Sequence, residues 1–561
     1  MSTTASAMTT SQRHLPGRSP SATVLFVLAS LISLPLLVIV FSVFNPAPEI
    51  WRHLLDTVLS EYILNSIKLM LGVGLLSLIL GIVPAWLTTM FRFPFSKQLE
   101  WALLLPLAMP AYIIAYTYTG ALDASGPIQT LIRDLTGWGF RDYWFPEIRS
   151  MGGAITMLAF VLYPYIYLIT RAAFINQSVC SLEAARTLGC GPWKVFFRIA
   201  LPLARPGIIV GLSLVLMETL ADYGTVQYFG ISAFTTGIFR TWFGLGNSAA
   251  AAQLSALLMV FVAVLVYVEY WSRQKQRYHH ISTRFSSLVQ KPIHGYQAVI
   301  ATIVCSLPVI AGFIIPVCFQ VNWALLTYVD VIDSAFLTLI WHSVLLAGLA
   351  AVIATALSLF MAYGKRQTAS TFTRLAVNMS GMGYAIPGTV IAVGVMLPLA
   401  WVDKMVDSYF RSHFDVSTGL ILSGTLFALL FAYTVRFLAV SLKTVDAGLT
   451  KIKPSMEEAG RSLGLGEFRL LRQVHIPMMR GSLLAAFLLV FVDVLKELPA
   501  TLILRPFNFN TLAIRAYELA NEERLADAAC PSLAIVLVGI IPVIYLSQSI
   551  SKSRPGHEFN A

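Results

Sequence analysis

The chain has 561 residues, of which 57% are hydrophobic and only 12% charged, and its formal net charge is +11. Soluble domains carry about 25% charged residues, so the composition excludes a disordered protein, a coiled coil, a disulfide scaffold and an ordinary soluble enzyme. The hydrophobic residues suffice for about a dozen membrane spans of about 20 residues each. The five cysteines are scattered without CxxC spacing, so neither a metal site nor a disulfide framework is indicated.

Apolar runs predict an all-α membrane protein with about twelve transmembrane helices. The first run follows a polar segment, is too long for the core of a signal peptide and has no small-residue cleavage site after it, so we expect an uncleaved span. The predicted spans are, in chain order, 22–44, 63–90, 99–121, 152–174, 207–229, 251–271, 297–320, 336–363, 373–400, 418–442, 481–504 and 529–549.

The connections between these runs differ in charge according to the side on which they lie. On the side of the N-terminus every connection is net positive, whereas four of the five opposite connections are net negative. Because Lys and Arg gather in cytoplasmic loops, we expect both termini in the cytoplasm. The strongly basic connection 272–296 is interpreted as a solvated tether near anionic lipid, and no nucleic-acid partner is expected.

The sequence repeats itself in two parallel halves. Residues 183–189 match residues 458–464 at an offset of 275, and upstream an offset of 277 aligns Pro110 with Pro387. Parallel repeats in a membrane suggest two bundles related by an axis along the membrane normal, with a pathway between them. The predicted organisation is a cytoplasmic segment (1–21), a first span with its periplasmic loop (22–60), repeat 1 (61–271), the linker (272–296), a seventh span with its periplasmic loop (297–335), repeat 2 (336–549) and a cytoplasmic tail (550–561).

Each half contains a cytoplasmic connection of about 30 residues whose sequence predicts a helix-turn-helix elbow. In the first elbow, Ser181 can cap a short helix that Gly189 ends. A second helical piece covers 193–200, and we expect Pro202 to break it. A single amphipathic elbow would be read as an interfacial helix, but two at matching positions indicate a paired docking surface.

These elbows resemble the signature of the integral membrane subunits of binding-protein-dependent ABC importers, which reads EAA, three residues, Gly, nine residues and I-x-L-P. The second copy departs at Gly460, which replaces the third motif residue, and at 474–476, which replaces I-x-L. The resemblance implies that loops 181–207 and 455–481 provide coupling helices that sit in a cleft of an ATPase subunit. The matching residues are Glu183, Ala184, Ala185, Gly189 and Pro202 in the first copy and Glu458, Ala459, Gly464 and Pro477 in the second.

The resemblance covers nearly all of residues 61–549 and also implies the partners. The chain contains no GxxxxGK[ST] phosphate loop and no HExxH or GxSxG motif, so it is expected to have no catalytic site and no cofactor. ATP and Mg would be bound by two copies of a partner ATPase, and one periplasmic binding protein would deliver the substrate. The expected location is the bacterial inner membrane.

Three segments carry a finer resemblance that concerns the substrate. Residues 218–230, 493–506 and 510–520 are similar to the fused permeases of ferric-iron importers. Fused permeases for thiamine, and relatives for phosphonates or polyamines, share much of this layout and remain alternatives. An integral membrane enzyme and a passive channel are more distant alternatives. The absence of catalytic motifs argues against the enzyme, and the two matched elbows argue against the channel.

Four carboxyl groups lie near the middle of predicted spans at equivalent positions of the two halves. Glu218 lies about 16 Å into its span at about 1.5 Å per residue, and Asp222 follows on the same helix face, while Asp493 and Glu497 repeat the pattern. A charged group near mid-bilayer costs at least about 2.5–3.5 kcal/mol. The four groups therefore either line a pathway that favours a hard cation or have a structural role. In the structural alternative they are protonated or pair with Lys496, Lys68, Arg171 or Arg436.

Overall fold

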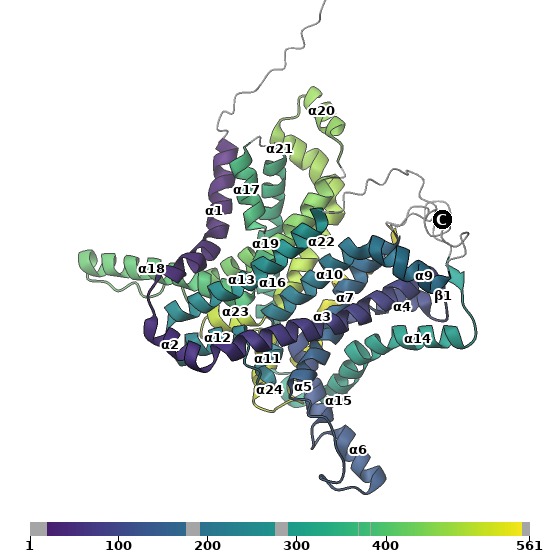
Figure 1. Cartoon of the computed structure of the whole chain (residues 1–561). Helices are drawn as coiled ribbons and strands as arrows, with labels where there is room; N and C mark the ends of the chain where they lie inside the picture. The colour runs from purple at the N-terminus through teal and green to yellow at the C-terminus, as the bar shows by residue number, and fades with distance from the viewer. Residues whose placement is uncertain are drawn as a thin grey trace, which may run out of the picture.

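The structure, a computed structural model, describes residues 20–175, 191–274, 290–367, 370–381, 383–450 and 452–552. The described residues are almost all helical (Figure 1), which confirms the predicted all-α class. Within them, the two short strands β1 (Phe91–Arg92) and β2 (Lys291–Pro292) pair in parallel. This pairing places the beginning of the second half beside the end of a long helix of the first half.

The helices follow the two halves of the sequence. In the first half they are α1 (Pro20–Phe41), α2 (Pro48–Thr57), α3 (Leu59–Met90), α4 (Ser96–Ala102), α5 (Ala111–Leu122), α6 (Pro127–Thr136), α7 (Met151–Ile175), α9 (Pro192–Val195), α10 (Leu201–Ala221), α11 (Gly224–Tyr228), α12 (Phe234–Phe239) and α13 (Ser248–Gln274). In the second half they are α14 (Tyr296–Val309), α15 (Ile315–Val331), α16 (Ser334–Gln367), α17 (Thr371–Ser380), α18 (Gly388–Phe414), α19 (Leu426–Leu449), α20 (Pro454–Ser462), α21 (Glu467–Leu470), α22 (Ile476–Leu495), α23 (Pro499–Leu504), α24 (Leu512–Asn521) and α25 (Ala529–Lys552).

The structure gives ten or eleven candidate spans where the sequence predicts about twelve. Among the described residues, ten helices are long and apolar enough to cross a membrane by length and composition. One bent pair of helices and one shorter apolar helix, Ala529–Tyr545, cover the remaining two predicted runs. The chain is therefore a multi-pass membrane protein built from two sets of helices.

Two predicted spans, 99–121 and 373–400, are broken and not continuous helices. The first bends by 92° between Ala108 and Ala111, and the second is divided between α17 and α18. In each case a proline, Pro110 or Pro387, occupies the cap before the next helix. Proline lacks an N–H and disfavours helical geometry in the residue before it, so both breaks follow from the sequence. They occur at equivalent positions of the two halves.

The expectation that Pro202 breaks the first elbow is wrong. The helix is continuous from Trp193 to Ala221, and a π-helical turn, Phe196–Ala200, directly precedes the proline. The wider turn accommodates the ring and the missing N–H of the proline without ending the helix. The second half repeats this solution, because the π-helical turn Leu471–His475 precedes Pro477.

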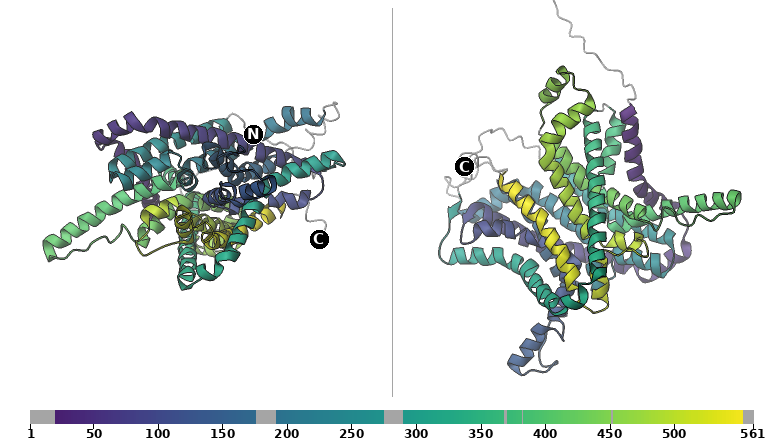
Figure 2. Two further views of the ribbon diagram at one scale, coloured as in Figure 1. Left: turned by 90° about the horizontal axis from the view of Figure 1, so that it is seen from below. Right: turned by 180° about the vertical axis from the view of Figure 1, so that it is seen from behind.

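The two halves pack into one another around a shared centre. Helices α3, α7 and α10 of the first half lie together, and α16, α19 and α22 of the second half run at a steep angle to them (Figures 1 and 2). The first helices are exchanged between the halves: α1 packs against α17 and α18, whereas α14 contacts α3 and α15 contacts α5. A continuous cluster of buried hydrophobic residues includes members of both halves.

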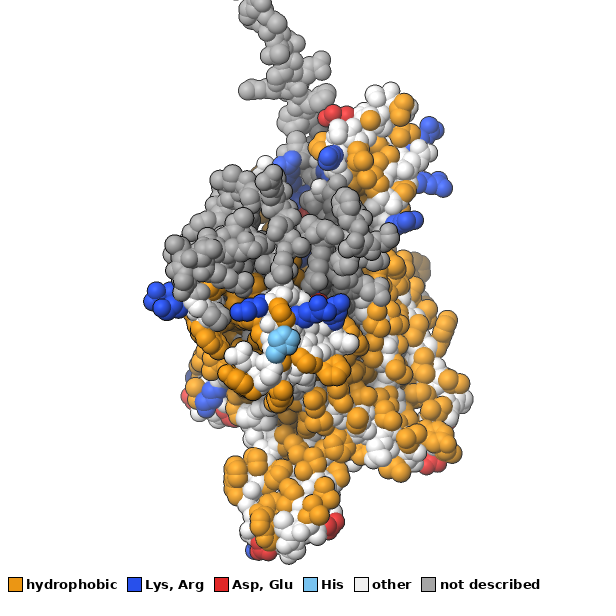
Figure 3. All heavy atoms as spheres, turned by 90° about the vertical axis from the view of Figure 1, so that its right-hand side faces the viewer, with side chains coloured by type: hydrophobic (Ala, Val, Ile, Leu, Met, Phe, Trp, Pro, Cys, Tyr) orange, Lys and Arg blue, Asp and Glu red, His pale blue; other side chains and the backbone are white. Residues whose placement is uncertain are grey.

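The outer surface is that of a protein surrounded by lipid. Large apolar side chains such as Leu71 and Leu75 on α3 and Ile303 on α14 are more than half exposed. Figure 3 shows a broad hydrophobic face, with most of the visible Lys and Arg side chains in its upper half and most of the visible Asp and Glu side chains in its lower half. Exposed apolar surface on this scale is unfavourable in water, and a bilayer removes that cost.

Candidate translocation cavity and coupling elbow

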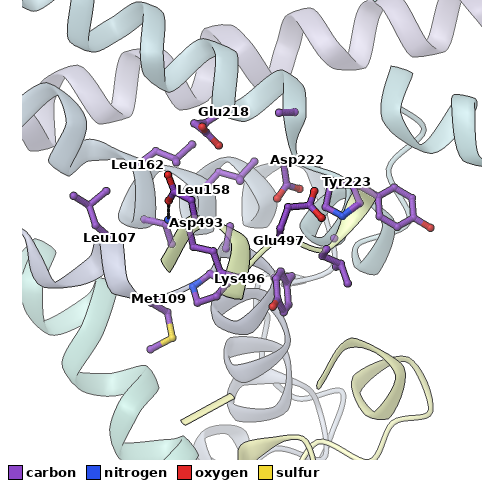
Figure 4. A pocket seen from close by; sticks show the side chains of 18 of the residues that line it. Leu107, Met109, Leu158, Leu162, Glu218, Asp222, Tyr223, Asp493, Lys496 and Glu497 are labelled. Atoms are coloured by element: carbon purple, nitrogen blue, oxygen red, sulfur yellow. Dashed lines mark ion pairs between the residues drawn. The ribbon is translucent and has the colours of Figure 1, made fainter. Parts of the chain in front are cut away.

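A cavity of about 120 Å³ lies between the two halves. The first half contributes α5, α7, α10 and α11 to its wall, and the second half contributes α19, α22 and α23. A space of this size holds several water molecules. Figure 4 shows that carboxylates of both halves surround it. All four carboxyl residues singled out in the sequence line it, namely Glu218, Asp222, Asp493 and Glu497.

Two of these carboxylates end one helix and cap the next. Asp222 follows α10 and accepts hydrogen bonds from the backbone N–H groups of Thr225 (3.0 Å) and Val226 (3.1 Å). Glu497 follows α22 and accepts from the groups three and four residues later, at 3.0 and 3.1 Å. A side-chain oxygen that accepts from the first N–H groups stabilises a helix start. The equivalent carboxylates thus break predicted spans 207–229 and 481–504 in the same way.

Two of the anticipated cations neutralise carboxylates of the second half. Arg436 Nη1 lies 2.6 Å from Glu497 Oε1, and Lys496 Nζ lies 2.9 Å from Asp493 Oδ1. Arg171 instead pairs with Glu100 at 2.6 Å. Within the described residues, Lys68 pairs with none of the four carboxylates. The structural alternative therefore holds for part of the group.

Glu218 differs from the other three. It lines the cavity and is half-buried, yet in the described part of the chain it has no side-chain hydrogen bond or ion pair. It lies close enough to Tyr165 and Lys496 to interact with them electrostatically. Four carboxylates and two cationic side chains line the cavity, so the fixed charge inside favours a cation.

The second elbow is described in full and forms the predicted helix-turn-helix. Glu458 and Ala459 lie exposed on α20. The turn to α21 passes through Gly464, whose φ of +80° is the left-handed geometry that glycine adopts without strain. Beside these residues, Leu463 and Phe468 are 81% and 74% exposed. The elbow thus presents an apolar surface with charged side chains of both signs at one extremity of the molecule (Figure 1).

Gly460, where the second copy departs from the EAA motif, is explained by packing inside the elbow. This glycine is buried, and a Cβ atom there would lie 2.5 Å from Leu470 Cδ1, so the missing side chain lets α20 approach α21. Pro202 and Pro477 are both exposed in the first turns of α10 and α22. The predicted first-copy residues Glu183, Ala184, Ala185 and Gly189 lie outside the described residues.

The sequence analysis missed several residues of the cavity wall. Tyr112, Tyr165 and Tyr384 line it, and Gly388 lies so close to the ion pair that a Cβ would be 2.1 Å from Arg436 Nη1. Aromatic residues within apolar helices produce no distinctive pattern, so hydropathy could not reveal them. The paired prolines before α5 and α18 were the available signal, because they mark breaks beside this cavity.

Comparison with known proteins places both halves in one family. The family described as "Binding-protein-dependent transport system inner membrane component" matches residues 77–278 and again residues 354–552. The two matches cover more than half of the chain and correspond to the two halves recognised from the internal repeat.

Several curated proteins are similar to the chain. The Fe(3+)-transport system permease protein FbpB 2 of Haemophilus influenzae is 26% identical over 495 residues, which cover 87% of this chain and 90% of that protein. The ferric transport system permease protein FbpB of Actinobacillus pleuropneumoniae is 24% identical, over 92% of this chain and 77% of its own length. The molybdenum transport system permease protein ModB of Escherichia coli is 31% identical, over 38% of this chain and 92% of that protein.

Proposed function

Because the chain belongs to the binding-protein-dependent transport system inner membrane components, we propose that it is the permease subunit of an ATP-driven importer for ferric iron. The family implies a periplasmic binding protein and an ATPase as partners. One elbow in each half would engage one ATPase copy, so we propose two ATPase copies and one binding protein for each chain. ATP and Mg would be bound by the ATPase, and both termini and both elbows would face the cytoplasm.

The observation that carries this proposal is the cavity between the halves. It is lined by carboxylates at equivalent positions of both repeats, and Glu218 forms no ion pair with a side chain of the described residues. Carboxylate oxygens suit hard cations, and a substrate that must also leave requires only transient binding. ATP-driven movement of the elbows would open this cavity first to the binding protein and then to the cytoplasm.

The charge of the cavity also separates the substrate alternatives. Molybdenum dissolves as an oxyanion, which four carboxylates with two cationic side chains would repel. Three of the relatives that match along most of this chain are named for ferric iron or Fe(3+). A phosphonate is also an anion and is disfavoured in the same way. Thiamine and polyamines are cations that the charge does not exclude, so uptake measurements must separate them from iron.

The first experiment measures uptake of radiolabelled iron, thiamine, a phosphonate, a polyamine and molybdate in cells that lack their own systems. The cells express this chain with its ATPase and binding protein. We expect ATP-dependent uptake of iron alone. Uptake of thiamine without iron would refute the substrate and leave the importer class standing. Flux that continues after ATP depletion would support a passive channel and refute the importer.

The role of the cavity is tested with Glu218→Gln, because this carboxylate caps no helix and its replacement changes charge more than packing. Loss of about 1.4 kcal/mol of interaction with the cation should lower iron uptake about tenfold, with protein amount and ATPase association unchanged. The matched control is Glu61→Gln, which removes the same charge from the exposed first turn of α3. Equal uptake by both variants would contradict a role of this cavity in translocation.

A further inference from the structure

A buried polar cluster joins the second elbow to the transmembrane helices. Glu457 on α20 lies 2.8 Å from Arg366 Nη2 of α16 and 3.0 Å from His475 Nε2, at the junction of α21 and α22. His475 is fully buried, and its Nδ1 lies 3.1 Å from the carbonyl oxygen of Leu470. A single carboxylate thus connects the elbow to two helices.

Arg366 extends the same cluster to a third transmembrane helix. Its guanidinium donates hydrogen bonds to the carbonyl oxygens of Leu449, at the end of α19, and of Ile452, at the beginning of the elbow. One turn earlier on α16, the Tyr363 hydroxyl donates to the carbonyl oxygen of Glu467 in α21 at 3.0 Å. The elbow is therefore bonded to α16, α19 and α22, the three helices that form the core of the second half.

The first half has apolar or uncharged residues at the corresponding positions. The repeat offsets place Thr89 opposite Arg366 and Ala200 opposite His475. In sequence, Leu182 corresponds to Glu457. Where the second half has Tyr363, the first has Trp86, whose ring packs against those of Phe174 and Phe196 with centroids 5.3 and 5.0 Å apart. The three positions that carry the polar cluster in the second half are thus uncharged in the sequence of the first half.

The bonds of the second junction decide how it responds to a displacing force. Charge-assisted hydrogen bonds are directional and short-ranged, so groups joined by several of them move together. A force applied to α20 is therefore transmitted through these bonded groups to α22. The cavity residues Asp493 and Glu497 lie near the other end of α22, so they move with that helix.

We infer that Arg366, Glu457 and His475 are positioning residues that transmit movement of the docked ATPase from the second elbow to the cavity. This inference rests on the proposed function. The second half moves with its elbow as one body. The cluster acts through the helices and does not touch the substrate.

The test replaces residues of the polar cluster with residues of the kind that the first half has at the corresponding positions. The variants are Glu457→Leu, His475→Ala and the triple variant that also carries Arg366→Thr, each reconstituted with ATPase and binding protein. We expect unchanged ATPase association and continued ATP hydrolysis, while iron transported per ATP falls on the order of tenfold. Glu457→Gln, which keeps one acceptor, should be intermediate. The matched control is Lys365→Met, whose ammonium bridges α16 to Asp446 of α19 at 3.2 Å without contacting the elbow.

A second readout does not depend on the substrate. Spin labels at the exposed residues Leu484 on α22 and Leu203 on α10 report the distance between the halves with and without ATP. The ATP-dependent change should shrink in the triple variant and persist in Lys365→Met. Loss of ATPase association in Glu457→Leu, or an unchanged distance response in the triple variant, would overturn the inference. If the parent chain takes up no iron but its inter-half distance still responds to ATP, only the assignment of iron as the substrate is refuted.

Discussion

The ion pair between Arg436 and Glu497 offers a test of how the broken helix in the second half is held. Glu497 has a 1% exposed side chain and lies 2.6 Å from Arg436 Nη1. The same carboxylate accepts the backbone N–H groups of Ala500 and Thr501 and the Thr501 hydroxyl at 2.8 Å. Replacing Glu497 with Gln keeps one acceptor oxygen but leaves the guanidinium without its counter-ion.

The expected magnitudes follow from burial. Removing one member of a buried ion pair costs about 3–5 kcal/mol of the free energy of unfolding. The equivalent change in the first half, Asp222→Asn, weakens hydrogen bonds to a charged group but leaves no buried cation unpaired, so we expect about 1–2 kcal/mol. Removing both charges of the second pair, in Arg436→Met with Glu497→Gln, should recover most of the loss because no uncompensated charge remains.

The assay is thermal denaturation of the purified protein in detergent, followed by the fraction that stays monodisperse after heating. The expected order of stability is the parent chain, then Asp222→Asn and the double variant, and last Glu497→Gln. A double variant that loses the sum of the two single losses would refute the ion-pair reasoning. Equal stability of Glu497→Gln and Asp222→Asn would show that capping alone holds the break.

Three further predictions concern glycines. Gly464→Ala forces a Cβ into the left-handed turn of the elbow at a cost of about 1–2 kcal/mol, so ATPase affinity measured by titration should fall about tenfold, whereas unchanged affinity would contradict the assigned turn. Gly388→Ala places a Cβ 2.1 Å from Arg436 Nη1 and 2.6 Å from Glu497 Oε1 and should lower the denaturation temperature, whereas an unchanged temperature would contradict this close approach. Gly460→Ala collides with Leu470 and should weaken ATPase association, which Leu470→Val should restore because the first half combines Ala185 with Val195.

The sequence predicted the features that depend on composition and on the repeat. Apolar runs located the spans because a transmembrane helix must be apolar along its whole length. The offset of 275 residues paired Glu218 with Asp493 and Asp222 with Glu497, and all four do line one cavity. Their placement could be predicted because charged residues near mid-span must be shielded from lipid, and parallel repeats provide a shielded pathway between their halves.

The features that were missed depend on local hydrogen bonding, which hydropathy does not record. A window across 207–229 averages over the break at Asp222, although its carboxylate ends one helix and caps the next. The π-helical turn before Pro202 was likewise invisible, and the proline was therefore read as a helix end. Which of the carboxylates form ion pairs could not be predicted, because this depends on tertiary contacts. Glu497 pairs with Arg436, whereas Glu218 has no such partner among the described residues.

The exchange of the first helices has a consequence for how the halves are joined. Since α1 packs on α17 and α18, and α14 packs on α3 and α4, each half is completed by a helix from the other, as in a domain-swapped dimer. The covalent connection is then dispensable for cohesion, and two polypeptides produced by cutting within 275–289 should still assemble. The fusion into one chain ensures that first and second halves are made in equal numbers and pair with each other. Neither half can then combine with a copy of itself.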